Sequence, residues 1–79
     1  MLSEISVDEI INEIKMNLNT LNSGFQFTLN QLVPNVRWMR CNEKMVGKKF
    51  RELVLNGEVS AAFAEDPINH SYPTKYVKI

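Results

Sequence analysis

The first third of the chain carries apolar residues at helical spacing. They recur every three or four positions, at Val7, Ile10, Ile11, Ile14, Leu18 and Leu21, which is typical of a helix with one buried face. Ser6 and Glu9 have the spacing of a capping box at its start. Asn22-Ser23-Gly24 marks its end. The pattern therefore predicts an N-terminal helix within residues 1–22.

A short strand and a short helix are predicted next. Phe25-Gln26-Phe27 alternates apolar and polar residues, as a strand does. Thr28 and Gln31 repeat the capping-box spacing and predict a helix over 29–33. Pro34 closes that helix, because the residue before a proline avoids α-helical geometry.

Residues 35–41 have no clear period. Val36, Trp38 and Met39 are expected to hold this segment against the core. Whether it contains a helical turn stays open, because the Pro34-Asn35 pair favours a turn without excluding one.

A longer helix is predicted over 42–55, where Asn56-Gly57 supplies the C-terminal stop. Its inward face consists of Val46, Phe50, Leu53 and Val54. On the opposite side lie Lys44, Lys48 and Arg51, spaced i, i+4, i+7; we call these three residues the basic stripe. Gly47 in mid-helix costs about 1 kcal/mol relative to alanine. It is therefore expected where a neighbouring helix or backbone approaches closely.

A hairpin is predicted over 59–79. Residues 59–64 and 74–79 alternate like strands, and the loop between them, 65–73, contains two prolines that a strand interior would reject. The predicted order is helix, short strand, two helices and a two-stranded hairpin. This is the layout of a winged helix-turn-helix, an α+β fold, in a single domain spanning 1–79. The segments 29–33 and 42–55 would form the helix-turn-helix unit and 59–79 the wing.

Several motifs resemble a small uncharacterised domain family of Gram-positive bacteria and their mobile elements. They are Gly24-Phe25-x-Phe27-x-Leu29-x-x-Leu32, Trp38, Val46-Gly47-x-x-Phe50-x-x-x-Val54-x-x-Gly57-x-Val59 and Tyr76. The resemblance covers about residues 24–79 and implies the winged-helix fold. By analogy it implies a DNA-binding role, in which 29–33 crosses the DNA backbone and 42–55 enters the major groove. The presumed wing tip, 65–70, departs from this expectation, because it carries two acids and no Lys or Arg.

Charge placement favours a nucleic-acid partner, although nine basic residues balance nine acidic ones. Six of the nine bases fall within 37–51, opposed there only by Glu43. These six candidate DNA-binding residues are Arg37, Arg40, Lys44, Lys48, Lys49 and Arg51. The alternatives are a solvated helix face for the stripe, and pairing with acids of the first helix for Arg37 and Arg40. Trp38 is expected to be a buried anchor rather than a stacking platform.

The sequence offers no catalytic machinery, so we expect no enzyme activity. Cys41 is the only cysteine and His70 the only histidine, far apart along the chain. A nucleophilic pair would need them within hydrogen-bond reach. His70 with two nearby acids is too small a set for a metal site, and no cofactor is expected. Proximity to a helix N-terminus would lower the pKa of the Cys41 thiol.

The absence of a signal peptide, a membrane-spanning stretch and a disulfide framework predicts a cytoplasmic protein with no membrane contact. The function favoured by the sequence is binding of double-stranded DNA, as a transcriptional regulator whose basic helix docks in the major groove. The alternative is a protein-interaction module, an inhibitor or adaptor, on the same scaffold. The apolar stripe of the first helix is only wide enough for its own core, so the sequence does not demand a dimer through this helix. A homodimer stays open by analogy with other DNA-binding modules of this size.

Overall fold

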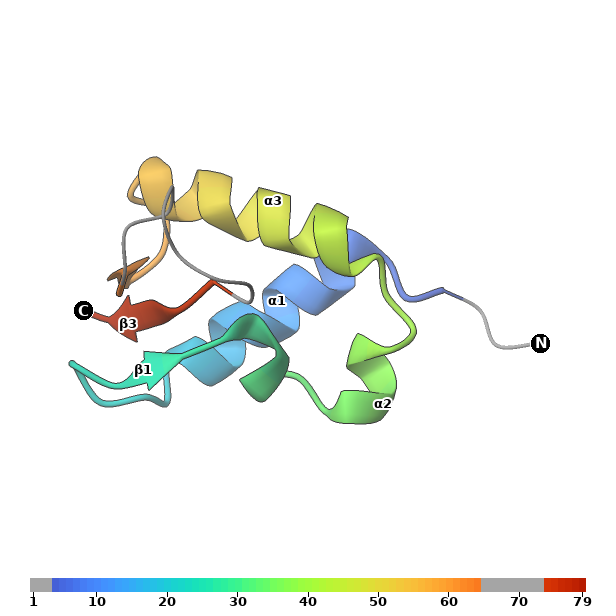
Figure 1. Cartoon of the computed structure of the whole chain (residues 1–79), viewed down its shortest axis with the longest axis horizontal. Helices are drawn as coiled ribbons and strands as arrows, with labels where there is room; N and C mark the ends of the chain where they lie inside the picture. Colours follow the sequence, from blue (N-terminus) through green and yellow to red (C-terminus); the bar gives the residue numbers. More distant parts are fainter. Residues whose placement is uncertain (1–3, 65–73) are drawn as a thin grey trace.

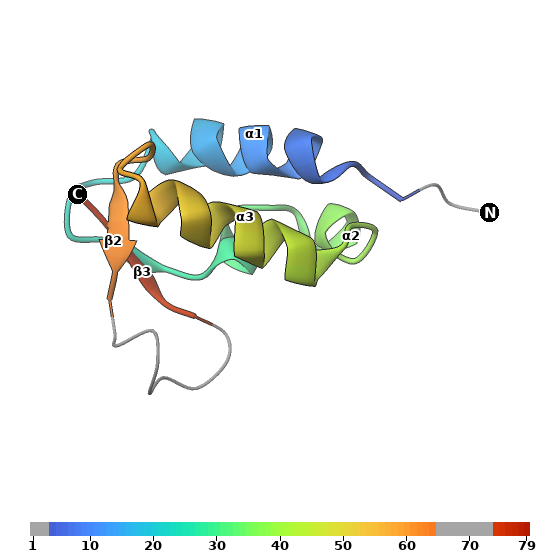
Figure 2. The ribbon, with the colours of Figure 1, turned by 90° about the horizontal axis from the view of Figure 1, so that it is seen from above.

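The computed structural model describes residues 4–64 and 74–79. In chain order the elements are α1 (Val7–Leu18), β1 (Gln26–Phe27), the 3₁₀ helix η1 (Leu29–Gln31), α2 (Asn35–Trp38), α3 (Glu43–Leu55), β2 (Ala61–Phe63) and β3 (Tyr76–Lys78). Helices α1 and α3 lie side by side, with the strands at one end of the pair and α2 at the other (Figures 1 and 2). The fold is α+β, with three α-helices and one small antiparallel sheet in the described part.

Helix α1 begins as predicted and ends earlier than predicted. The Ser6 hydroxyl accepts a hydrogen bond from the Glu9 amide at 3.2 Å, which caps the first turn. The helix stops at Leu18 because the following amides bond three residues back: Thr20 to the Asn17 carbonyl at 3.1 Å, and Leu21 to that of Leu18 at 3.0 Å. Such bonds tighten the last turn. Leu21 still packs against the core from this turn.

The predicted helix over 29–33 is only a 3₁₀ turn over Leu29–Gln31. Its N-terminus has the expected partner, since the Gln31 side chain accepts from the Thr28 amide at 2.9 Å. Propagation stops because Pro34 excludes α geometry just before it. The carbonyl of Pro34 then accepts from the amides of Arg37 and Trp38, at 3.0 and 2.9 Å, and starts α2.

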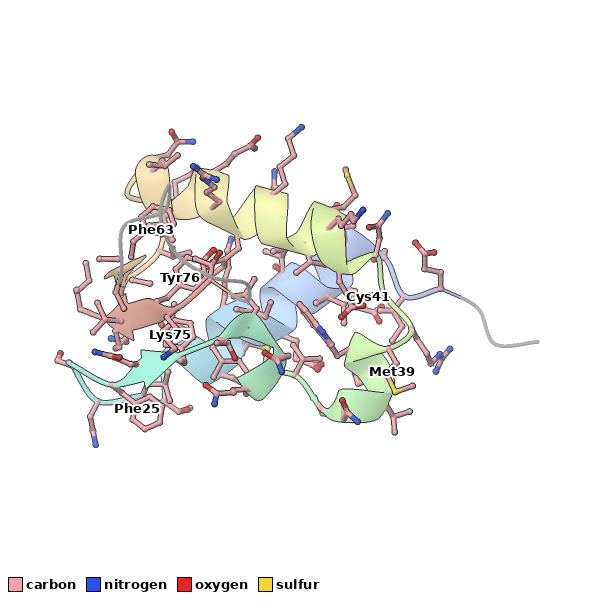
Figure 3. All side chains as sticks on the ribbon, viewed as in Figure 1. Phe25, Met39, Cys41, Phe63, Lys75 and Tyr76 are labelled. Atoms are coloured by element: carbon pink, nitrogen blue, oxygen red, sulfur yellow. The ribbon has the colours of Figure 1, made fainter. Side chains whose placement is uncertain are left out.

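Helix α2 settles the conformation of residues 35–41 and corrects one expectation. The segment contains one helical turn, but Val36 and Met39 do not pin it to the core: they are 69% and 73% exposed. They lie three residues apart and so share one face of the turn, and that face is turned to solvent. Met39 projects away from the body of the molecule in Figure 3. Of the three residues expected to do so, only Trp38 packs against the core, and it is half-buried.

Helix α3 has the predicted ends to within one residue. The Asn42 side chain accepts from the Met45 amide at 3.2 Å and caps the N-terminus. At the other end Gly57 adopts φ +70°, a left-handed conformation that suits glycine. The amide of Glu58 bonds to the Leu53 carbonyl at 2.9 Å and that of Gly57 to Val54 at 3.1 Å. These two bonds form a Schellman motif.

The predicted hairpin and the short early strand join in one sheet. Strand β3 lies in the centre, antiparallel to both neighbours, in the order β1-β3-β2. Tyr76 is opposite Phe27 on one side and Phe63 on the other. The residues of the loop, 65–73, lie outside the described part, and so does the presumed wing tip.

Aromatic rings join α3 to the sheet. The rings of Phe50 and Tyr76 meet edge to face with centroids 4.9 Å apart, and Tyr76 stacks on Phe27 at 5.8 Å. Phe63 lies 5.5 Å from Tyr76 on the other strand, and both residues are seen below α3 in Figure 3. This cluster fixes the position of α3 relative to β3, and therefore the surface that the two elements form together.

Candidate nucleic-acid interface

A groove of about 540 Å³ runs beside the outer face of α3. The residues that line it come from η1, α2, α3 and the β3 segment: Leu29, Asn30, Trp38, Glu43, Lys44, Gly47, Lys48, Arg51, Thr74 and Tyr76. All three residues of the basic stripe are among them. The remaining wall is largely apolar, so the groove combines cationic and apolar chemistry.

The stripe is presented to solvent, as the spacing in the sequence predicts. Lys44, Lys48 and Arg51 are exposed, while Val46 and Phe50 of the same helix are fully buried. No carboxylate of the described residues lies within ion-pair distance of Lys44 or Lys48. These two ammonium groups are therefore available to an anionic partner.

Arg51 is held more firmly than the two lysines. Its guanidinium lies 6.0 Å from the centre of the Phe63 ring, a cation–π contact with β2. Its position therefore depends on the hairpin as well as on α3. Lys49 is exposed but does not line the groove, because at about 100° per residue it lies about 100° from Lys48 around the helix axis, away from the stripe.

The structure shows the ion-pairing alternative for Arg37. Its Nε donates to both carboxylate oxygens of Glu13, at 2.8 and 3.0 Å, and Nη2 donates to Glu9 at 3.2 Å. The hydrogen bond to Glu13 is the largest effect and raises the pKa of Arg37; desolvation opposes it, and the hydrogen bond to Glu9 adds to the rise. Arg37 thus connects α2 to α1. Arg40 is half-buried, and its carbonyl accepts from the Ile5 amide at 2.8 Å.

Gly47 does not occupy the site of close packing that the sequence suggested. A Cβ built there meets no atom of the described residues within 4 Å. Its φ is not positive either, unlike that of Gly24 or Gly57. Gly47 faces the groove instead, and so its missing side chain leaves room there.

Two aromatic residues of the groove were not predicted as part of a site. Trp38 was expected as a buried anchor, and it both packs against the core and lines the groove. Tyr76 is buried, and this burial raises the pKa of its phenol, an effect that nearby Arg51 opposes. Neither role has a local signal in the sequence, because each depends on how η1, α2 and β3 are placed around α3.

Cys41 is not an activated thiol. Burial raises its pKa, and the charges of Glu43 and Glu4 add to that effect, which outweighs a backbone hydrogen bond acting in the other direction. Its Sγ donates to the Trp38 carbonyl at 3.1 Å. His70 lies outside the described part. Within residues 4–64 and 74–79, no three His, Cys, Asp or Glu residues are grouped as a metal ion would require.

Comparison with known protein families shows which family the chain belongs to. The model of a family described as "Domain of unknown function (DUF1413)" matches residues 12–78. The chain belongs to this family. The DUF1413 match begins inside α1, whereas the motifs noted in the sequence begin only at Gly24. The match confirms the resemblance to an uncharacterised family. No curated protein and no solved structure matches the chain significantly. In the part of the chain that the structure describes, no helix is long and apolar enough to cross a membrane.

Proposed function

We propose that this DUF1413 domain is a winged helix-turn-helix that binds double-stranded DNA and acts as a transcriptional regulator. The observation that carries the proposal is the basic stripe. Lys44, Lys48 and Arg51 are exposed along a groove, and the two lysines have no acidic partner among the described residues. Phosphates attract such a surface, and the release of their counterions favours binding.

The order of the elements supports the winged-helix assignment. A helix and a short strand are followed by α2, α3 and a hairpin, and β1 pairs with the last strand rather than with the next one. In a winged helix the same pairing places the hairpin beside the recognition helix. Here α2, not 29–33, directly precedes α3, so in the proposed unit α2 would be the first helix.

The dimensions of α3 suit the proposed docking. A helix with its side chains is about 10–12 Å across, and the major groove of B-DNA is about 12 Å wide. The stripe begins at Lys44, one residue after the first residue of α3. In helix-turn-helix complexes the N-terminal half of the recognition helix enters the major groove. Lys44, Lys48 and Arg51 would each neutralise a phosphate at the groove edge, and the guanidinium of Arg51 also has the fork geometry that reads guanine.

The test is a pair of charge-reversal variants that change the net charge equally. Lys44→Glu/Lys48→Glu reverses two charges of the stripe, and Lys15→Glu/Lys78→Glu reverses two on α1 and β3, away from the groove. Fluorescence anisotropy with random-sequence duplex DNA at about 50 mM salt measures the affinity, and circular dichroism checks the fold. We expect the first variant to lose binding and the second to keep most of it. Equal losses, or no binding by the unmodified protein, would refute the proposal.

A second candidate is a protein-interaction module on the same scaffold. The exposed apolar pair Val36 and Met39 on α2 favours it, with Met45 half exposed at the start of α3. Absence of DNA binding at low salt would favour this candidate. The variant to test for loss of a protein partner would then be Val36→Ser/Met39→Ser.

A further inference from the structure

Gly47 lies in the middle of α3, and the described residues give no packing or backbone reason for a glycine there. Glycine destabilises a helix interior relative to alanine. A positive φ or close packing against a neighbouring element can require a glycine, and within the described residues Gly47 has neither. Gly57, at the end of the same helix, has φ +70° and is required by the Schellman motif. Among the described residues nothing requires a glycine at position 47, so we look for the reason on the side that it faces.

That side is the groove. At about 100° per residue, Gly47 lies about 40° from Arg51 and about 60° from Lys44 around the helix axis, on the edge of the stripe. Across the groove are Leu29, Asn30 and Tyr76. A side chain at Gly47 would project into the space between these two walls. Without one, the backbone of α3 itself forms the wall.

The lining identifies the chemistry of the occupant. Leu29, Trp38 and Tyr76 offer apolar contacts, and the basic stripe offers positive charge along one rim. A sugar–phosphate strand presents these two features together, because deoxyribose carbons alternate with phosphates. Glu43 is the one carboxylate among the described lining residues. It lies at the N-terminal end of α3, so the phosphates would lie nearer Lys48 and Arg51.

We propose that Gly47 is the point of closest approach between α3 and one strand of the bound duplex, whose sugar–phosphate backbone enters this groove. The inference rests on the proposed DNA binding and adds to it a position where size, not charge, limits affinity. Interior amides of a helix are already hydrogen-bonded. Contact at Gly47 is therefore a van der Waals contact, and any side chain there would push the strand away from the stripe.

The test measures stability and affinity on the same variants. Gly47→Ala should raise the melting temperature by about 4–8 °C, because alanine is the better helix former. It should also weaken DNA binding two- to fivefold. Gly47→Leu should weaken binding tenfold or more, again in a folded protein. The control is Asn12→Leu, which adds the same side chain to an exposed position of α1 and should bind like the unmodified protein.

Opposite changes in stability and affinity would distinguish a contact site from a folding defect. Wild-type affinity in both Gly47 variants would overturn the inference and leave the proposed function intact, provided that the unmodified protein binds DNA. Failure of Gly47→Ala to raise the melting temperature would also overturn it, because the glycine would then serve the fold. If the unmodified protein binds no DNA, the proposed function fails and the inference fails with it.

Discussion

The salt dependence of DNA binding gives a quantitative prediction for the basic stripe. Neutralising Lys44 and Lys48 as glutamine leaves Arg51 as the only charge of the stripe. On B-DNA each neutralised phosphate contributes about −0.9 to the slope of log affinity against log salt. Three contacts thus predict a slope of about −2.7 for the unmodified protein, and one contact predicts about −0.9 for the Lys44→Gln/Lys48→Gln variant.

These slopes are far enough apart to be measured. Between about 50 and 200 mM salt, the affinity of the unmodified protein should fall about 40-fold, and that of the variant only about 3.5-fold. Anisotropy titrations at four salt concentrations would resolve the two lines. Lys15→Gln/Lys78→Gln removes the same charge from α1 and β3 and should keep a slope near −2.7. A slope that falls equally in both double variants would show that net charge, not the stripe, governs binding, and would refute the reasoning.

Two further predictions concern the core and the buried thiol. Phe50→Leu removes a fully buried ring that faces both Phe27 and Tyr76. Each ring pair contributes about 0.5–1.5 kcal/mol, so the variant should lower the free energy of unfolding, measured with urea, by roughly 1–3 kcal/mol. Phe25→Leu, at an exposed ring, should cost under about 0.5 kcal/mol, and a similar cost for both would contradict the described core. Because burial raises the pKa of Cys41, iodoacetamide at pH 8 should modify this thiol more slowly in the native protein than in guanidinium. Equal rates by mass spectrometry would show that the thiol is not protected.

Elements that are stabilised by neighbouring residues could be predicted from the sequence. Asn42 and Gly57 define the ends of α3 through hydrogen bonds within a few residues, so the local sequence contains the information. The same holds for Ser6 at the start of α1. The basic stripe was also predictable, since the apolar residues of α3 fix which face is buried, and the opposite face must then be exposed.

Features that depend on distant elements were not predictable. Val36 and Met39 are as apolar as core residues, and only the placement of α2 against α1, through Arg37 and Glu13, leaves them exposed. The groove likewise requires β3 to lie between β1 and β2, beside α3. No local sequence pattern indicates this arrangement. For the same reason Gly47 suggested an internal packing contact, whereas the described residues leave the space beside it open.

The zero net charge of the chain is compatible with a DNA-binding surface because of where the charges lie. Arg37 pairs with Glu9 and Glu13, so one base of the 37–51 cluster neutralises part of α1 instead of contributing to the stripe. The stripe lies on the face of α3 opposite its buried residues, and α1 packs against α3. A helix with its side chains is about 10 Å across. The Debye length is also about 10 Å at 0.1 M salt and about 30 Å at 0.01 M. Near physiological salt the acids of α1 are therefore screened from DNA bound at the stripe. At very low salt their repulsion reaches the DNA, and the log–log plot should flatten there.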